Sequence, residues 1–158
     1  DDKASAACLL TLLWQMRETG TLPRYETYLT FTVHEEVGHG GATLPVVDEL
    51  LAVDMGCIGE DLGCTEYQVS ICAKDNGGPY DYDMVSRLVK LAKEHQVDYS
   101  VDIYPHYGSD VGAAWHAGMD CRAALIGPGV HASHGMEHTH LDALHATLDL
   151  AALYLELA

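Results

Sequence analysis

The chain has 158 residues, of which 48% are hydrophobic and 20% charged, a composition typical of one globular domain with a real core. It has 24 acidic but only 8 basic residues and a formal net charge of -16, which argues against nucleic acid or an anionic membrane surface as a partner. Solubility alone explains most surface charge, although some of these carboxylates are also candidate metal ligands.

The cysteines and the hydropathy pattern predict a soluble, cytoplasmic protein. No apolar run approaches the roughly 20 residues of a membrane span, and no charged-then-apolar leader starts the chain. The cysteines are odd in number, form no C-x-x-C pair and lie mostly in apolar runs, so we expect reduced core thiols at Cys8, Cys57, Cys64, Cys72 and Cys121.

The N-terminal third predicts one helix followed by two strands. Lys3–Glu18 has apolar residues at helical spacing, with Asp2 suited to cap its start and Gly20 to end it. Tyr25–Val33 is aromatic and β-branched and alternates, which favours a strand. Glu49–Asp54 is a second strand, with an acid at its end.

Helices and strands alternate through the rest of the chain. We predict a third strand at Tyr67–Ala73, a loop at Asn76–Pro79, a helix at Asp83–His95, a strand at Val97–Tyr104, a short helix at Val111–His116, a strand at Cys121–Ile126 closed by Gly127-Pro128-Gly129, and a helix at Leu141–Leu157. Alternation of this kind predicts an α/β fold, a three-layer domain with a mixed, largely parallel sheet covered by helices. With no internal repeat or linker, the chain forms one domain.

Acidic residues and histidines follow the predicted strands. Glu35 and Glu36 come after one strand, Asp54 ends the next, and Asp110 and the histidine-rich stretch 131–140 follow later ones. In open α/β sheets ligands gather beyond the strand ends, so we expect these side chains to meet. Clustered carboxylates and imidazoles repel unless a cation neutralises them, and this mixture suits zinc, cobalt or manganese.

Each of these features alone has a simpler explanation. Adjacent glutamates after a strand are usually solvated, Asp54 can cap a turn, and Asp1-Asp2 can be a helix N-cap. Histidines are common on surfaces. The Glu35-Glu36 pair also lacks the histidines spaced four residues apart on a helix that a gluzincin needs. The features therefore have to be judged together.

Together the motifs resemble those of the glutamyl aminopeptidase family, which includes the tetrahedral aminopeptidases and bacterial aminopeptidases once named endoglucanases. The resemblance covers nearly the whole chain and rests on five motifs in the family's order, at Asp1–Ala6, Thr32–Gly38, Ala52–Asp54, Tyr107–Asp110 and Ala132–Glu137. Members are cocatalytic, dinuclear metallo-aminopeptidases. The resemblance therefore implies a zinc-exopeptidase-like fold.

The resemblance also assigns roles to individual residues. It implies Glu35 as the general base, and as metal ligands Asp1 bridging both ions, Glu36 on one ion, Asp54 on the other, and the late histidine His134, for which His131 is a rival. Asp110 and Glu137 resemble supporting residues near the site. The family differs in carrying a basic residue at the position of His138.

The family pattern contains more than these residues. Its second histidine ligand, in an H-x-D segment, and its dimerisation domain both lie upstream of the bridging aspartate. By resemblance, residues 1–158 are therefore the C-terminal major part of the catalytic domain, and we expect an upstream segment to be missing. The dimerisation domain would be missing with it.

The resemblance implies a cytoplasmic metallo-aminopeptidase that removes the N-terminal residue of short peptides and assembles as a homo-oligomer, a dodecamer by analogy. Two divalent ions per subunit, zinc or cobalt before manganese, would activate a water for Glu35 to deprotonate. One alternative is an amidase or deacylase on the same scaffold. Another is a non-catalytic metal-binding assembly subunit, against which the presence of Glu35 argues.

Overall fold

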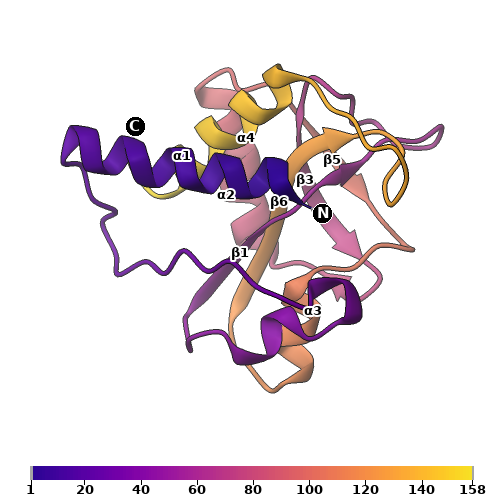
Figure 1. Cartoon of the computed structure of the whole chain (residues 1–158), viewed down its shortest axis with the longest axis horizontal. Coiled ribbons are helices and arrows are strands. Elements are labelled where there is room, and N and C mark those ends of the chain that lie inside the picture. The colour runs from indigo at the N-terminus through magenta and orange to yellow at the C-terminus, as the bar shows by residue number, and fades with distance from the viewer. Residues whose placement is uncertain (1, 158) are drawn as a thin grey trace.

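A mixed sheet of six strands forms the centre of the computed structural model, which describes residues 2–157 (Figure 1). The order is β1-β6-β3-β4, with β2 on β6 and β5 on β3. The strands are β1 Glu49–Val53, β2 Gly56–Cys57, β3 Val69–Asp75, β4 Gly78–Pro79, β5 Tyr99–Ile103 and β6 Arg122–Val130. The pairs β1–β6, β2–β6 and β3–β5 are parallel, whereas β3 runs antiparallel to β4 and β6.

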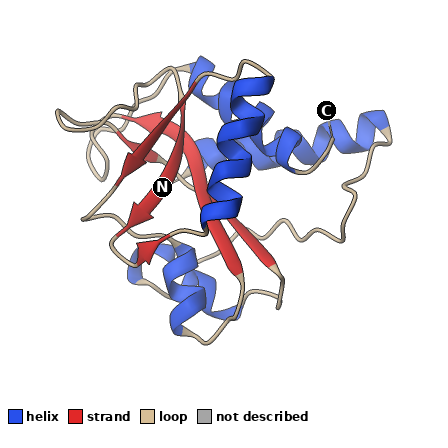
Figure 2. Cartoon of the chain, turned by 180° about the vertical axis from the view of Figure 1, so that it is seen from behind, coloured by secondary structure: helices blue, strands red, loops and turns tan. Residues whose placement is uncertain are grey.

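Helices cover both faces of this sheet (Figures 1 and 2). They are α1 Lys3–Thr19, α2 Tyr82–Glu94, α3 Asp110–His116 and α4 Leu141–Tyr154. Alternate residues of β6 enter different clusters: Ala124 and Ile126 pack with α1, α2 and α4, whereas Ala123 and Leu125 pack with Val111 of α3. The central strand β6 is therefore buried on both sides, and the predicted α/β fold with a mixed, mostly parallel sheet is confirmed.

The helix boundaries follow from their caps. The Asp2 side chain accepts a hydrogen bond from the Ser5 amide at 3.0 Å, and Gly20 ends α1 in the left-handed conformation with φ of 69°. Asp81 caps α2 and Ser109 caps α3 in the same way. All four predicted helices are confirmed to within a few residues.

Within the described residues, no helix is both long and apolar enough to cross a bilayer.

The predicted strand at Tyr25–Val33 is wrong. The segment is irregular, with bends at Tyr25 and Val33, and within residues 2–157 it joins no ladder and makes no backbone-to-backbone hydrogen bond. Its large side chains are exposed, Tyr25 by 70% and Val33 by 73%. The β-prone composition is real, but a strand also requires a partner edge, which composition cannot supply.

Two Gly-Pro stretches that we predicted as loops are strands instead. β6 continues through Gly127-Pro128-Gly129 to Val130, because these glycines let other backbone segments approach: a Cβ on Gly127 would collide with the carbonyl oxygen of Asp54. Gly78 and Pro79 form β4, which pairs antiparallel with the end of β3 across a tight turn. The predicted loop at Asn76–Pro79 is therefore only the turn of a hairpin. The two-residue β2 was not predicted.

Candidate metal centre and active site

Five of the predicted site residues line one groove at the carboxyl ends of β1 and β6. Asp54 follows β1 directly, and His134 lies in the loop after β6. Glu35 and Glu36 begin a 3-10 turn, Glu35–Val37, and Asp110 begins α3. All five side chains border a groove of about 1840 Å³. Because β1 and β6 are parallel, their carboxyl ends share one edge of the sheet, which brings Asp54 and His134 to the same groove despite their separation in sequence.

Glu36 and His134 contact each other directly. Oε2 of Glu36 lies 3.0 Å from Nε2 of His134. The backbone amide of His134 donates to Oε1 of Glu137 at 2.7 Å, so Glu137 holds the loop that carries the imidazole. Two predicted ligands are thus brought together, with the predicted supporting residue behind one of them.

His131, the rival of His134, faces a different partner. Its Nε2 lies 3.3 Å from Oε2 of Glu66. Its ring stacks on that of His138 with centroids 4.9 Å apart, and the two residues also form an antiparallel β-bridge. The structure therefore places His134, and not His131, beside the predicted ligand Glu36.

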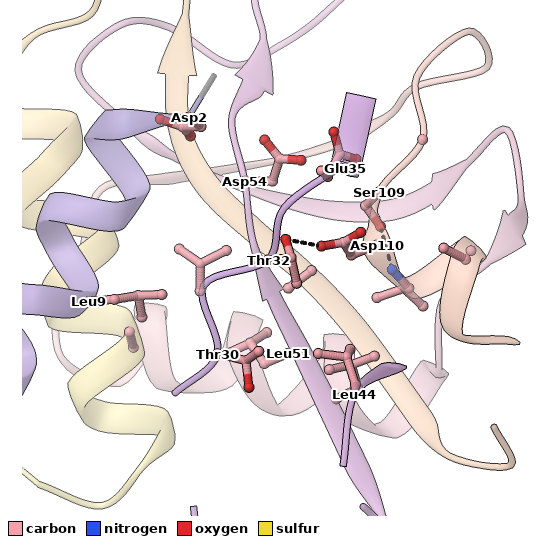
Figure 3. A pocket seen from close by; sticks show the side chains of 18 of the residues that line it. Asp2, Leu9, Thr30, Thr32, Glu35, Leu44, Leu51, Asp54, Ser109 and Asp110 are labelled. Atoms are coloured by element: carbon pink, nitrogen blue, oxygen red, sulfur yellow. Dashed lines mark hydrogen bonds between the residues drawn. The ribbon is translucent and has the colours of Figure 1, made fainter. Parts of the chain in front are cut away.

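Both Glu35 and Asp54 have raised pKa values in this groove, and the charge of Asp54 contributes to the rise at Glu35 (Figure 3). Burial, followed by the charges of Asp54, Asp110 and Glu36, raises the pKa of Glu35 to about 7, while His134 opposes the rise. Burial also raises the pKa of Asp54 to about 6, and a hydrogen bond of 2.7 Å from the Met55 amide opposes this. The carboxylates are therefore close enough to repel one another.

Asp110 ties the segment before Glu35 to α3. The Thr32 hydroxyl donates to Oδ2 of Asp110 at 2.6 Å (Figure 3). Oδ1 of Asp110 is buried, with no hydrogen-bond partner among the described residues. Gly40 is required beside this carboxylate, because any Cβ there would collide with it. Asp110 thus holds the segment that leads into the Glu35-Glu36 turn.

The donor set fits divalent cations. Carboxylates crowded in a half-buried groove, one with an unpaired buried oxygen, gain stability when a cation neutralises them. Within residues 2–157, no three Asp, Glu, His or Cys side chains converge tightly enough to enclose an ion by themselves. The predicted bridging ligand Asp1 lies outside the described residues. The described part of the chain therefore supplies separate donors around the groove.

Two residues near the site were missed by sequence reasoning. Thr32 holds Asp110, as described above. Tyr107 is half-buried, its hydroxyl donates to the Met55 carbonyl oxygen at 2.8 Å, and the same hydroxyl lowers the pKa of the nearby Asp54 carboxyl. Both residues stand inside the motifs that carry the family resemblance, which was the available signal. Neither residue type indicates such a role by itself.

The raised pKa values predict how stability depends on pH in the presence of a chelator. The pKa of Glu35 rises from 4.5 to about 7, so the folded chain holds a proton that the unfolded chain has lost in this range. The contribution of Glu35 to the free energy of unfolding is therefore fully present below pH 4.5 and is lost as the pH rises through about 7. We therefore expect the difference in stability between Glu35→Gln and the parent to shift in favour of the variant when the pH is raised from about 4.5 to about 8. Urea unfolding in EDTA measures this difference.

The control for this experiment is Glu94→Gln, which removes an exposed carboxylate at the end of α2, far from the groove. Its stability relative to the parent should not follow the trend of Glu35→Gln. If Glu35→Gln and Glu94→Gln shift equally between the two pH values, the groove does not disfavour the Glu35 charge.

Comparison with known proteins gives a consistent assignment. The model of the family described as "M42 glutamyl aminopeptidase" matches residues 1–150. The "Putative aminopeptidase YhfE" of Bacillus subtilis (strain 168) is 46% identical over 158 residues, which are 99% of this chain and 46% of that protein. The chain thus spans less than half the length of this relative.

Solved structures share the fold. Aminopeptidase APDkam598 from Desulfurococcus kamchatkensis superposes with a TM-score of 0.83 at 22% identity, over 100% of this chain and 48% of that one. PhTET1-12s, solved as a dodecamer, superposes with a TM-score of 0.77 at 19% identity, over 96% of this chain and 47% of that one. Since the family model covers almost the whole sequence, the chain belongs to the M42 glutamyl aminopeptidase family.

Proposed function

We propose that the polypeptide carrying this chain is a metal-dependent aminopeptidase that hydrolyses the N-terminal residue of short peptides. The observation that carries the proposal is the placement of Glu35 in one groove with Asp54, Asp110 and the Glu36–His134 pair. A half-buried carboxylate beside candidate metal ligands is the arrangement that a hydrolytic general base requires. Family membership supports the same reaction class.

The groove residues divide into ligands and a proton carrier. Glu36 and His134 would hold one divalent ion and Asp54 a second, with Asp1 between them by resemblance to the family. Zinc or cobalt suits these donors best, with manganese as a third candidate. When bound, such ions supply Lewis-acid chemistry, which acidifies water and polarises an amide carbonyl.

Glu35 would move the proton. Its carboxylate would take a proton from the attacking water and pass it to the amine that leaves. The Thr32–Asp110 hydrogen bond holds the backbone just before it, and so limits how far Glu35 can drift from the groove. This division gives the adjacent glutamates different roles, Glu35 as base and Glu36 as ligand.

The proposal extends to the whole polypeptide. We propose that residues 1–158 are the C-terminal major part of a catalytic domain, that an upstream segment supplies a second histidine ligand, and that the protein is a cytoplasmic homo-oligomer. The chain matches only 46% of the Bacillus relative, which supports a longer polypeptide. The dodecameric relative supports oligomerisation, and the free thiols at all five cysteines suit a reducing compartment.

A panel of chromogenic aminoacyl substrates with zinc, cobalt or manganese tests the function on the polypeptide that includes the upstream segment. We expect release from substrates with a free α-amine. Release only from N-acylated substrates would indicate a deacylase. If metal is bound but no substrate is cleaved, the protein is a non-catalytic metal-binding subunit.

A further inference from the structure

The loop after β6 restrains the backbone of His134. The backbones of His131 and His138 form an antiparallel β-bridge that closes the loop at its base. Inside the loop, the Gly135 amide donates to the Ala132 carbonyl oxygen at 2.8 Å. Ala132 and His134 have φ values of 55° and 60°, a left-handed conformation that residues other than glycine seldom adopt. The place at which the His134 side chain leaves the backbone is therefore set by the loop.

The orientation of the His134 ring depends on two contacts. Nε2 lies 3.0 Å from Oε2 of Glu36, and Nδ1 lies 3.1 Å from Oγ of Ser133. A rotation of the ring by half a turn about its Cβ–Cγ bond would exchange both nitrogens for carbons and lose both contacts. Glu36 and Ser133 together therefore select one orientation of the imidazole, in which Nε2 faces Glu36.

Ser133 lies beside Cys57 of β2. Cys57 pairs with Val130, the last residue of β6, which places β2 alongside the start of the loop. Burial, followed by the charge of Asp54, raises the pKa of the Cys57 thiol, and the Ser133 hydroxyl opposes this rise. The hydroxyl therefore has a neutral thiol and an imidazole as neighbours. It can donate its proton towards the sulfur while its oxygen accepts a proton from the ring.

A hydroxyl at this position suits both states of a metal-binding histidine. When Nε2 gives its lone pair to an ion, Nδ1 carries the ring proton, and the Ser133 oxygen can accept that proton. Without an ion, Nε2 can carry the proton and donate it to Glu36, and the hydroxyl can then turn to donate to Nδ1. A hydroxyl serves in both states because it is a donor and an acceptor.

We propose that Ser133 is a positioning residue that orients the His134 imidazole and accepts its Nδ1 proton, so that Nε2 is available to a divalent ion beside Glu36. This inference rests on the proposed function, in which His134 is a ligand, and deepens it. It does not use Glu35 or the hydrolytic step. Its test is therefore the binding of the metal alone.

The zinc affinity of Ser133→Ala tests the proposal on the polypeptide that includes the upstream segment. The substitution removes the acceptor for the Nδ1 proton but no ligand. We expect the affinity for one zinc ion to fall about 10- to 100-fold, the usual effect of removing a hydrogen-bond partner from a metal-bound histidine. Ser133→Thr keeps the hydroxyl and should bind zinc like the parent. Competition with a chelator measures all three affinities.

The matched control is Ser86→Ala, which removes an exposed hydroxyl from α2, outside the groove. It should bind zinc like the parent. Unfolding in EDTA should give the same stability for the parent, Ser133→Ala and Ser133→Thr, because the proposed role concerns the ring and not the folding of the loop.

Cobalt supplies a spectroscopic readout of the ligand geometry. The visible absorption of bound cobalt depends on the orientation and donor strength of its ligands. At saturating cobalt, we expect the spectrum of Ser133→Ala to differ from that of the parent and the spectrum of Ser133→Thr to match it. Identical spectra for all three proteins would overturn the proposal. Equal loss of zinc affinity in Ser133→Ala and Ser133→Thr would also overturn it.

His134→Ala separates this inference from the proposed function. If His134→Ala loses zinc while Ser133→Ala binds it like the parent, the inference fails and the proposed ligands stand. If His134→Ala binds zinc like the parent, the inference and the proposed ligand both fail. If the zinc and cobalt results are as expected but no peptide is cleaved, the inference stands and the proposed peptidase activity fails.

Discussion

Glu35→Gln is expected to reduce aminopeptidase turnover by about 10²- to 10⁴-fold while the metal content stays at that of the parent. The amide of Gln keeps the size of the side chain but cannot accept and release a proton. Because Glu36, Asp54 and His134 are unchanged, the proposed ligands remain in place. Turnover and elemental analysis of the same preparation measure both quantities.

The matched control for this loss is Glu60→Gln, which removes an exposed glutamate from a loop outside the groove. It should leave both turnover and metal content unchanged. Two results would remove Glu35 from its proposed role. Retained turnover shows that another group moves the proton, and loss of metal in Glu35→Gln makes the residue a ligand.

The second large effect is expected at Asp54. Asp54→Asn keeps the shape of the side chain and an oxygen for the Met55 amide, but it removes the buried charge. We expect the affinity for one metal ion to fall at least about 100-fold. This loss is larger than the loss of metal affinity caused by removing a residue that only hydrogen-bonds to a ligand. Without metal, the variant should be as stable as the parent or more stable, because burial disfavours the carboxylate.

Calorimetric titration with zinc and unfolding in EDTA measure these two properties of Asp54→Asn. Asp61→Asn serves as the control, since Asp61 is an exposed acid on a loop. An Asp54→Asn protein that binds as many ions as the parent, with equal affinity, shows that Asp54 is not a ligand. A loss of stability without metal would instead give Asp54 a structural role.

The sequence predicted helices better than strands, for a physical reason. A helix satisfies its own backbone, so periodicity and caps such as Asp2 and Gly20 were enough to place α1. Tyr25–Val33 has the composition of a strand, but no strand forms where no neighbouring backbone pairs with it. Gly127-Pro128-Gly129 has the composition of a turn, but it continues β6 because the backbones beside it come close.

The sequence predicted which residues belong to the candidate site but not how they are arranged in space. Strand ends and family motifs selected Glu35, Asp54 and His134, and the topology of the sheet brings them to one groove. The contact of Glu36 with His134 spans 98 positions, a distance at which residue spacing carries no information. Similarly, composition could not reveal the support from Thr32 and Tyr107, because it depends on which loops come together.

Paired peptides test the central claim most directly. The polypeptide with its upstream segment is incubated with zinc or cobalt and either a short peptide with a free N-terminus or the same peptide N-acetylated, and the products are identified by mass spectrometry. We predict that single residues are released from the free N-terminus and that the acetylated peptide stays intact. Cleavage of both peptides at an internal bond, or no cleavage of either with metal bound, would contradict the account.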